Sequence, residues 1–107
     1  MSEIVQYSLE SNVAQITLNR PEALNALNGA LLQQLTKNVT DAGNDQNVRA
    51  LIITGTGRAF SSGGDLRGVG TDDPLDPLKN ADQLRRYEEI SLLLSEMPKP
   101  TIAAING

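Results

Sequence analysis

ALIITGTGRAFSSGGDL, residues 50–66, is the most informative stretch of this 107-residue chain for its fold class. Its opening run, residues 50–54, is almost wholly apolar and lies between Arg49 and Gly55. Such a run is typical of a strand buried on both faces of a helix-covered sheet. Glycines follow at once, at the strand end where ligand sites tend to lie in α/β proteins. We therefore expect an α/β protein with its functional loop directly after this strand.

Hydrophobic periodicity predicts the remaining elements on both sides of that stretch. In chain order, these elements are strands at 4–9 and 13–18, a structured loop at 19–27, a helix at 29–42, the strand at 50–54, a helix from about 80 to 97 and a strand at 101–105. The last strand has the pattern of a buried strand. Two strands followed by alternating helices and strands indicate helices packed on a sheet.

The predicted ends of both helices have identifiable chemistry. Asn28 can cap the first helix, and Gly43 is expected to stop it. The second helix is expected to begin near Asn80 and to end before Pro98. On its apolar face, Tyr87 is expected to lie in the core.

Composition excludes several classes of function. The chain has a formal charge of −4 and 3% aromatic residues, which disfavours nucleic-acid binding. It has no Cys and no His, so disulfides, thiol nucleophiles and most zinc ligand sets are excluded. No apolar run reaches the length of a membrane span, and the N-terminal residues do not resemble a signal peptide, so we expect a cytoplasmic protein.

The charged clusters are interpreted as surface features. Asp72, Asp73 and Asp76 lie in a proline-interrupted segment without the spacing of a Ca²⁺ loop, so we expect solvated acids and no metal site. Arg85 and Arg86 are expected to be surface charges rather than phosphate ligands.

The glycine-rich loop leaves two interpretations open. It contains no Gly-Lys pair, so it is not a nucleotide phosphate loop, and a dinucleotide fingerprint would need glycine where Phe60 stands. In one remaining interpretation, residues 61–64 let peptide N–H groups approach a ligand, with Asp65 capping the next turn or helix. In the other, Gly63 and Gly64 only turn the chain.

Four stretches of the sequence together resemble one family. In order they are VAQITLNRP continuing to ALNAL (13–27), LIITG (51–55), AFSSGGDL (59–66) and KPTIAAING (99–107). They cover essentially the whole chain and resemble the crotonase superfamily, that is, the enoyl-CoA hydratase/isomerase enzymes. The resemblance implies a crotonase-like (ClpP/crotonase) α/β fold of ββα repeats, with residues 1–107 as the N-terminal part of a single acyl-CoA-binding domain.

The same resemblance implies an acyl-CoA thioester as substrate. In such enzymes two backbone N–H groups hold the thioester carbonyl oxygen and stabilise an enolate-like intermediate, and Gly64 matches the first of these donors. The second donor and the catalytic glutamates of the family match nothing up to Gly107. The implied contacts of the substrate are Ala23, Leu24 and Ala26 at the adenine end of coenzyme A, and Ser62, Gly64, Asp65 and Leu66 at the thioester. The second helix, including Leu84 and Tyr87, is expected to border the acyl pocket.

Two hypotheses about the function remain open. In the first, the parent protein is an acyl-CoA hydratase, isomerase or related lyase. It needs no cofactor besides the coenzyme A of its substrate, and it assembles as a homo-trimer or hexamer. In the second, the chain is a non-catalytic acyl-CoA-binding or partner-dependent fragment. Because Asn106-Gly107 is a turn signal directly after a strand, we expect the chain to be truncated, and to be inactive by itself.

Overall fold

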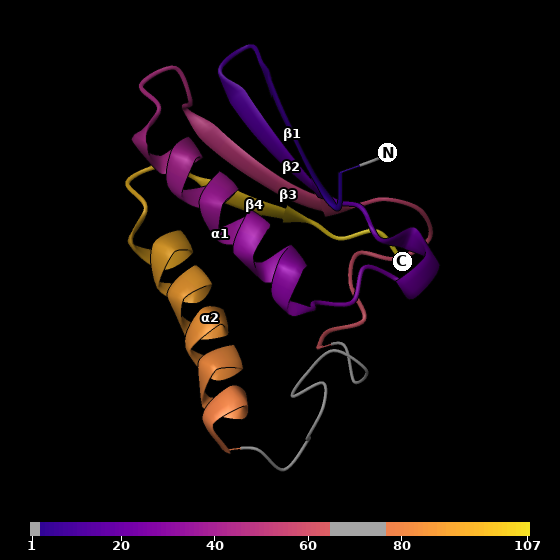
Figure 1. The fold of residues 1–107 in the computed structure, drawn as a ribbon. Helices are drawn as coiled ribbons and strands as arrows, with labels where there is room; N and C mark the ends of the chain where they lie inside the picture. Colours follow the sequence, from indigo (N-terminus) through magenta and orange to yellow (C-terminus); the bar gives the residue numbers. More distant parts are fainter. Residues whose placement is uncertain (1–2, 65–76) are drawn as a thin grey trace.

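A four-stranded sheet with two helices forms the described part of the chain (Figure 1). The computed structural model describes residues 3–64 and 77–107. Its elements are β1 (Val5–Glu10), β2 (Val13–Leu18), the 3-10 turn η1 (Pro21–Ala23), α1 (Gly29–Asn44), β3 (Ala50–Gly55), α2 (Pro77–Glu96) and β4 (Thr101–Ala104). The strand order is β1-β2-β3-β4; β1 runs antiparallel to β2, and the other pairs are parallel. This order confirms the predicted succession of elements.

The hairpin between β1 and β2 follows from its two central residues. Glu10 pairs with Val13, so the loop consists of Ser11 and Asn12 alone. Both have positive φ, 52° and 68°, as a type I′ turn requires. The twist of that turn matches the twist of the strands and fixes the register of β1 on β2.

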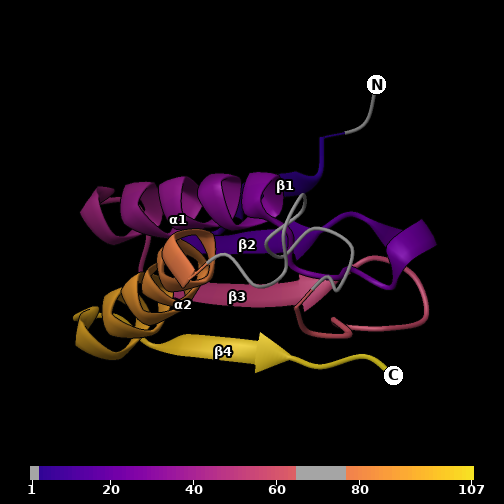
Figure 2. The same ribbon diagram turned by 60° about the horizontal axis from the view of Figure 1, so that its bottom comes forward.

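The core lies between one face of the sheet and α1. α1 packs against β1 and β2, and α2 runs beside α1 (Figures 1 and 2). Apolar residues at helical spacing on α1 meet alternate residues of the strands. The buried cluster comprises Val5, Ala14, Ile16, Leu18, Leu31, Leu32, Leu35, Val39, Ala42, Val48, Leu51, Ile53 and Ile90. Tyr87 packs partly buried against it, as the sequence predicts.

Burial of β3 and β4 differs from the prediction. In β3, Leu51 and Ile53 are buried but Ile52 is only half-buried, so one face of this strand is covered instead of both. All four residues of β4 are exposed, and Ile102, which pairs with Ile52, is 52% exposed. The physical reason is that α1 covers β1 and β2, that α2 packs mainly against α1 and not on the strands, and that β4 lies at the sheet edge in the described part. The apolar residues of β3 and β4 therefore predicted more burial than the described part of the chain provides.

Both helices extend beyond their predicted bounds. α1 does not stop at Gly43 but continues to Asn44, and its C-cap Asp45 is extended, with φ −85°. A Cβ on Gly43 would lie 3.3 Å from Met97 Cε, so this glycine serves close packing of the helices instead of a left-handed stop. α2 begins at Pro77, three residues before the predicted start, because proline is tolerated in the first turn of a helix. The predicted N-cap of α1 is confirmed: Asn28 Oδ1 accepts from the Leu31 N–H at 2.9 Å.

No helix among residues 3–64 and 77–107 combines the length and hydropathy needed to cross a bilayer.

Candidate functional site

Residues 19–27 form a rigid loop organised by Asn25. Leu24 and Asn25 both have left-handed backbone, with φ of 53° and 55°. Asn tolerates this conformation better than most residues because its side chain can bond the backbone locally. Here the Asn25 Oδ1 accepts from the Arg20 N–H at 2.7 Å, as expected of an asparagine in this loop. Asn25 is 0% exposed, so the loop is closed around its side chain.

The same asparagine fixes the glycine loop after β3. Asn25 Nδ2 donates to the carbonyl oxygens of Thr56 at 3.0 Å and Ala59 at 2.9 Å. On the other side, Asn106 Nδ2 donates to the carbonyl oxygens of Gly55 at 2.8 Å and Gly57 at 3.0 Å. Two buried or half-buried amides from distant parts of the sequence therefore hold residues 55–59 in place.

Residues 62–64 of the glycine loop run directly alongside the loop formed by residues 19–27, which we call the first loop. The Ser62 N–H donates to the Leu24 carbonyl at 3.0 Å, and the Leu27 N–H donates to the Gly63 carbonyl at 2.7 Å. Leu27 and Gly64 form a parallel β-bridge. The structure therefore brings together the two stretches that were predicted to contact opposite ends of one ligand.

These contacts determine the direction of the Gly64 N–H group. In a trans peptide the carbonyl of one residue and the N–H of the next point in opposite directions. Because the Gly63 carbonyl points at Leu27, the Gly64 N–H points away from the first loop. Within the described residues it donates no hydrogen bond. Gly63 has φ 93° while a Cβ there would meet nothing within 4 Å, so backbone conformation, not space, requires glycine at this position.

The predicted contact residues occupy different environments. Ala23 and Leu24 are half-buried, and Ser62 and Gly64 are exposed beside them. Ala26 is only 7% exposed, and its carbonyl accepts from Arg20 Nη1, so its side chain offers little surface to a ligand. The other two predicted contacts, Asp65 and Leu66, lie outside the described residues, as does the acidic segment 71–76.

The charge of the two loops favours an anion. Residues 19–27 and 55–64 carry Arg20 and Arg58 against a single acid, Glu22. Arg58 and Glu22 are exposed, and Arg20 is half-buried. No group of three potential metal ligands occurs in the part of the chain that the structure describes. The arrangement thus offers backbone donors and positive charge, and no preformed metal site in these residues.

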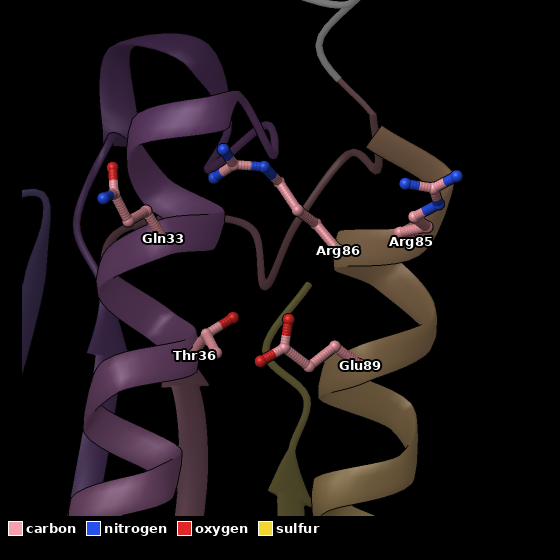
Figure 3. Close-up of a pocket in the computed structure, with 5 residues that line it drawn as sticks. All are labelled: Gln33, Thr36, Arg85, Arg86 and Glu89. Atoms are coloured by element: carbon pink, nitrogen blue, oxygen red, sulfur yellow. The ribbon is translucent and has the colours of Figure 1, made fainter. Parts of the chain in front are cut away.

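A separate polar hollow lies between the two helices (Figure 3). Its volume is about 360 Å³, and its lining residues are Gln33 and Thr36 of α1 and Arg85, Arg86 and Glu89 of α2. In Figure 3 the Arg86 side chain points across toward α1, and Glu89 points toward Thr36. Arg85 is exposed, as predicted for a surface charge, and Arg86 is half-buried at the hollow, which contains none of the predicted site residues.

Sequence reasoning missed two residues that shape the site, Ser61 and Asn106, and a third, Lys99, that binds the C-terminal end of α1. Ser61 Oγ donates to the Asn25 carbonyl at 2.8 Å and accepts from the Gly63 N–H at 3.1 Å. Asn106, interpreted only as a turn signal, bonds the glycine loop instead. Lys99 Nζ donates to the carbonyls of Ala42 and Asp45 at the end of α1. The only feature of the sequence that could have indicated these roles was residue type, since Ser, Asn and Lys side chains commonly donate to backbone carbonyls. Their hydrogen-bond partners are remote in the sequence, so no local pattern identifies them.

The fold is a crotonase fold: a solved enoyl-CoA hydratase/isomerase from Xanthobacter autotrophicus matches with TM-score 0.91 and 36% identity, over 100% of this chain and 40% of that one. A 1,2-epoxyphenylacetyl-CoA isomerase of Escherichia coli is 37% identical over 100% of this chain and 41% of its own length. A probable enoyl-CoA hydratase of Rhodobacter capsulatus is 39% identical over 96% and 38%.

The sequence profile of the family described as enoyl-CoA hydratase/isomerase matches residues 8–107. The chain belongs to this family and corresponds to its N-terminal portion. It spans about 40% of the length of the relatives it matches.

Proposed function

We propose that these 107 residues form the first half of an acyl-CoA site in which the Gly64 N–H donates to the thioester carbonyl oxygen. The observation that carries the proposal is the orientation of the Gly63–Gly64 peptide. The Gly63 carbonyl is bonded to the Leu27 N–H, and the Gly64 N–H points outward beside exposed backbone. An N–H that is fixed in direction and donates to none of the described residues is a preorganised donor for an oxygen that gains negative charge.

The chemistry of the proposed donor is electrostatic. When a proton leaves or adds next to a thioester carbonyl, charge accumulates on the carbonyl oxygen. A backbone donor already aimed at that position stabilises the charge without reorganising. Removal of one such donor costs about 10²–10³ in rate in enzymes where it has been measured. Gly64 is the proposed catalytic donor, and Ser62, Asp65 and Leu66 are the proposed neighbours of the thioester.

Coenzyme A is proposed to lie along the first loop as part of the substrate, with no separate cofactor. Ala23 and Leu24 are half-buried at the surface of η1 and next to Ser62. Because Ala26 is almost fully buried, its contribution is proposed to come from the backbone. Arg20 and Arg58 give the two loops an excess of positive charge, which suits the phosphates of the coenzyme.

Turnover requires more than these residues supply. Two carboxylates lie in or next to these loops: Glu22 is exposed on η1, and Asp65, which follows Gly64 in the sequence, is expected to cap the next turn or helix. General acid–base catalysis needs a proton-transfer group within hydrogen-bond reach of the reacting atom. We therefore propose that the proton-transfer groups and the second backbone donor of the parent enzyme come from residues outside these 107. A non-catalytic acyl-CoA-binding fragment is the second candidate, favoured by the same lack of a placed acid or base in the two loops.

The test is binding and turnover measured on the same sample. Isothermal titration calorimetry of the purified chain with crotonyl-CoA and with free coenzyme A is expected to show binding of both. Loss of the absorbance of the conjugated thioester is expected to stay at the rate of the protein-free control. Failure of both ligands to bind refutes the proposed site. Measurable hydration refutes the statement that the catalytic groups lie elsewhere.

A further inference from the structure

We infer that Ser61 is a positioning residue: its hydroxyl group fixes the Gly63–Gly64 peptide and thereby the direction of the Gly64 N–H. No residue-level role for Ser61 follows from the family resemblance or from the proposed contacts of coenzyme A. The inference rests on the proposed function, because only a ligand at Gly64 gives that direction a use. Ser61 itself is not proposed to touch substrate, and it acts through two neighbouring backbone groups.

The hydroxyl group of Ser61 joins the two loops at one atom. It donates its hydrogen to the Asn25 carbonyl at 2.8 Å and accepts from the Gly63 N–H at 3.1 Å. A serine hydroxyl has one donor and two acceptor positions, so both bonds form at the same time. The carbonyl partner is firmly placed, because Asn25 is 0% exposed and its side chain is bonded on three sides.

Both polar groups of Gly63 are therefore held. Its N–H donates to Ser61 Oγ, and its carbonyl accepts from the Leu27 N–H at 2.7 Å. Gly63 has the left-handed φ of 93° and no side chain, so without these two bonds it has more accessible backbone conformations than any other residue. Rotation at Gly63 turns the following peptide plane and with it the Gly64 N–H. The Ser61 hydroxyl removes this freedom at a position where glycine is needed for the turn.

Three variants separate positioning from simple stability. Ser61→Ala removes both hydrogen bonds, and Ser61→Thr keeps the hydroxyl group as a conservative rescue. Ser8→Ala, on exposed β1, is the matched control for loss of a serine hydroxyl far from the loop.

The first readout needs no ligand. Amide hydrogen exchange of Gly63 is expected to accelerate roughly two- to tenfold in Ser61→Ala, the range set by one net hydrogen bond, and to return toward wild type in Ser61→Thr. The Leu51 amide in the core serves as an internal reference for global stability. Unchanged Gly63 exchange in Ser61→Ala relative to Leu51 overturns the inference, whatever the protein binds. If Ser61→Ala does not fold, the Ser61→Thr variant decides, because it keeps the hydroxyl group. Faster amide exchange at Gly63 but not at Leu51 in this variant also overturns the inference.

The second readout compares crotonyl-CoA with a thioether analogue in which a methylene group replaces the carbonyl. The wild-type chain is expected to bind the thioester roughly two- to tenfold more tightly, because only the thioester can accept from Gly64. In Ser61→Ala this ratio is expected to fall toward one while the affinity for the thioether stays unchanged. If the role of Ser61 were merely structural, Ser61→Ala would weaken the binding of both ligands equally, and this result would contradict the inference. Failure of both ligands to bind wild type refutes the proposed function instead, and the exchange rate of Gly63 then decides the role of Ser61.

Discussion

Replacement of Asn25 by alanine is expected to destabilise the fold more than any other single asparagine change among the residues that hold the loops. The side chain makes three hydrogen bonds inside the protein, to the backbone of Arg20, Thr56 and Ala59. At about 1 kcal/mol net for each, their loss costs about 3 kcal/mol. The left-handed backbone of Asn25 adds about 1 kcal/mol when alanine must adopt it. The expected total is about 4 kcal/mol, a large part of the stability of a domain of this size.

Urea denaturation followed by circular dichroism measures this loss. With a slope of about 1.5 kcal/mol per molar, the midpoint of Asn25→Ala is expected to fall by more than about 2 M. Asn25→Gly adopts the left-handed backbone without strain, so it is expected to recover about 1 kcal/mol and to isolate the hydrogen-bond part. Asn47→Ala, on an exposed asparagine, is expected to change stability by less than about 0.5 kcal/mol. A loss below about 1 kcal/mol for Asn25→Ala would refute the conclusion that this residue organises both loops.

Three further perturbations test other contacts. Lys99→Met removes two donors from the carbonyls of Ala42 and Asp45 and should lower the free energy of unfolding by about 1–2 kcal/mol in urea; no change would show that this cation does not stabilise the end of α1. Gly55→Ala places a Cβ 2.7 Å from a backbone oxygen of its own loop, so a loss of at least about 2 kcal/mol is expected by thermal melting, and an unchanged melting temperature would contradict this packing. Burial, and then the nearby carboxylates of Asp45 and Asp41, raise the pKa of Tyr7 above its ordinary 10.0, so its stabilising contribution is complete below pH 10 and declines as pH rises through the folded-state pKa. Tyr7→Phe should therefore flatten the alkaline decline in urea midpoint; an equal decline in both proteins would contradict the shift.

Local patterns in the sequence predicted the elements well because each pattern has a local cause. The short gap between the predicted strands at 4–9 and 13–18 is a two-residue turn with two positive φ values, and Asn28 caps α1 as predicted. Alternation and helical spacing predicted the strands and helices within a few residues. The predictions that failed depend on neighbours that no local pattern contains. The apolar residues of β4 predicted burial, whereas α1 covers β1 and β2 and α2 packs mainly against α1, which leaves this strand exposed.

The candidate site was predictable only in part, for a similar reason. The glycine loop and the Asn25 loop were each visible as motifs, but their contact joins residues more than thirty positions apart. Ser61 stood within a quoted motif without a role, because its function depends on a carbonyl supplied by Asn25. Asn106 bonds a loop about fifty residues away for the same reason. Spacing along the chain says which residues can turn or cap, and only the fold says which backbone groups they reach.

Whether Gly64 faces the thioester can be observed directly in the amide spectrum of the chain labelled with ¹⁵N-glycine and titrated with crotonyl-CoA. The Gly64 N–H resonance is expected to move downfield with crotonyl-CoA, as a new hydrogen bond to the thioester oxygen requires. The thioether analogue is expected to bind without this shift, and Gly43 inside α1 should not respond to either ligand. Binding of crotonyl-CoA with no selective change at Gly64 would contradict the proposed site, because the donor would then not face the thioester.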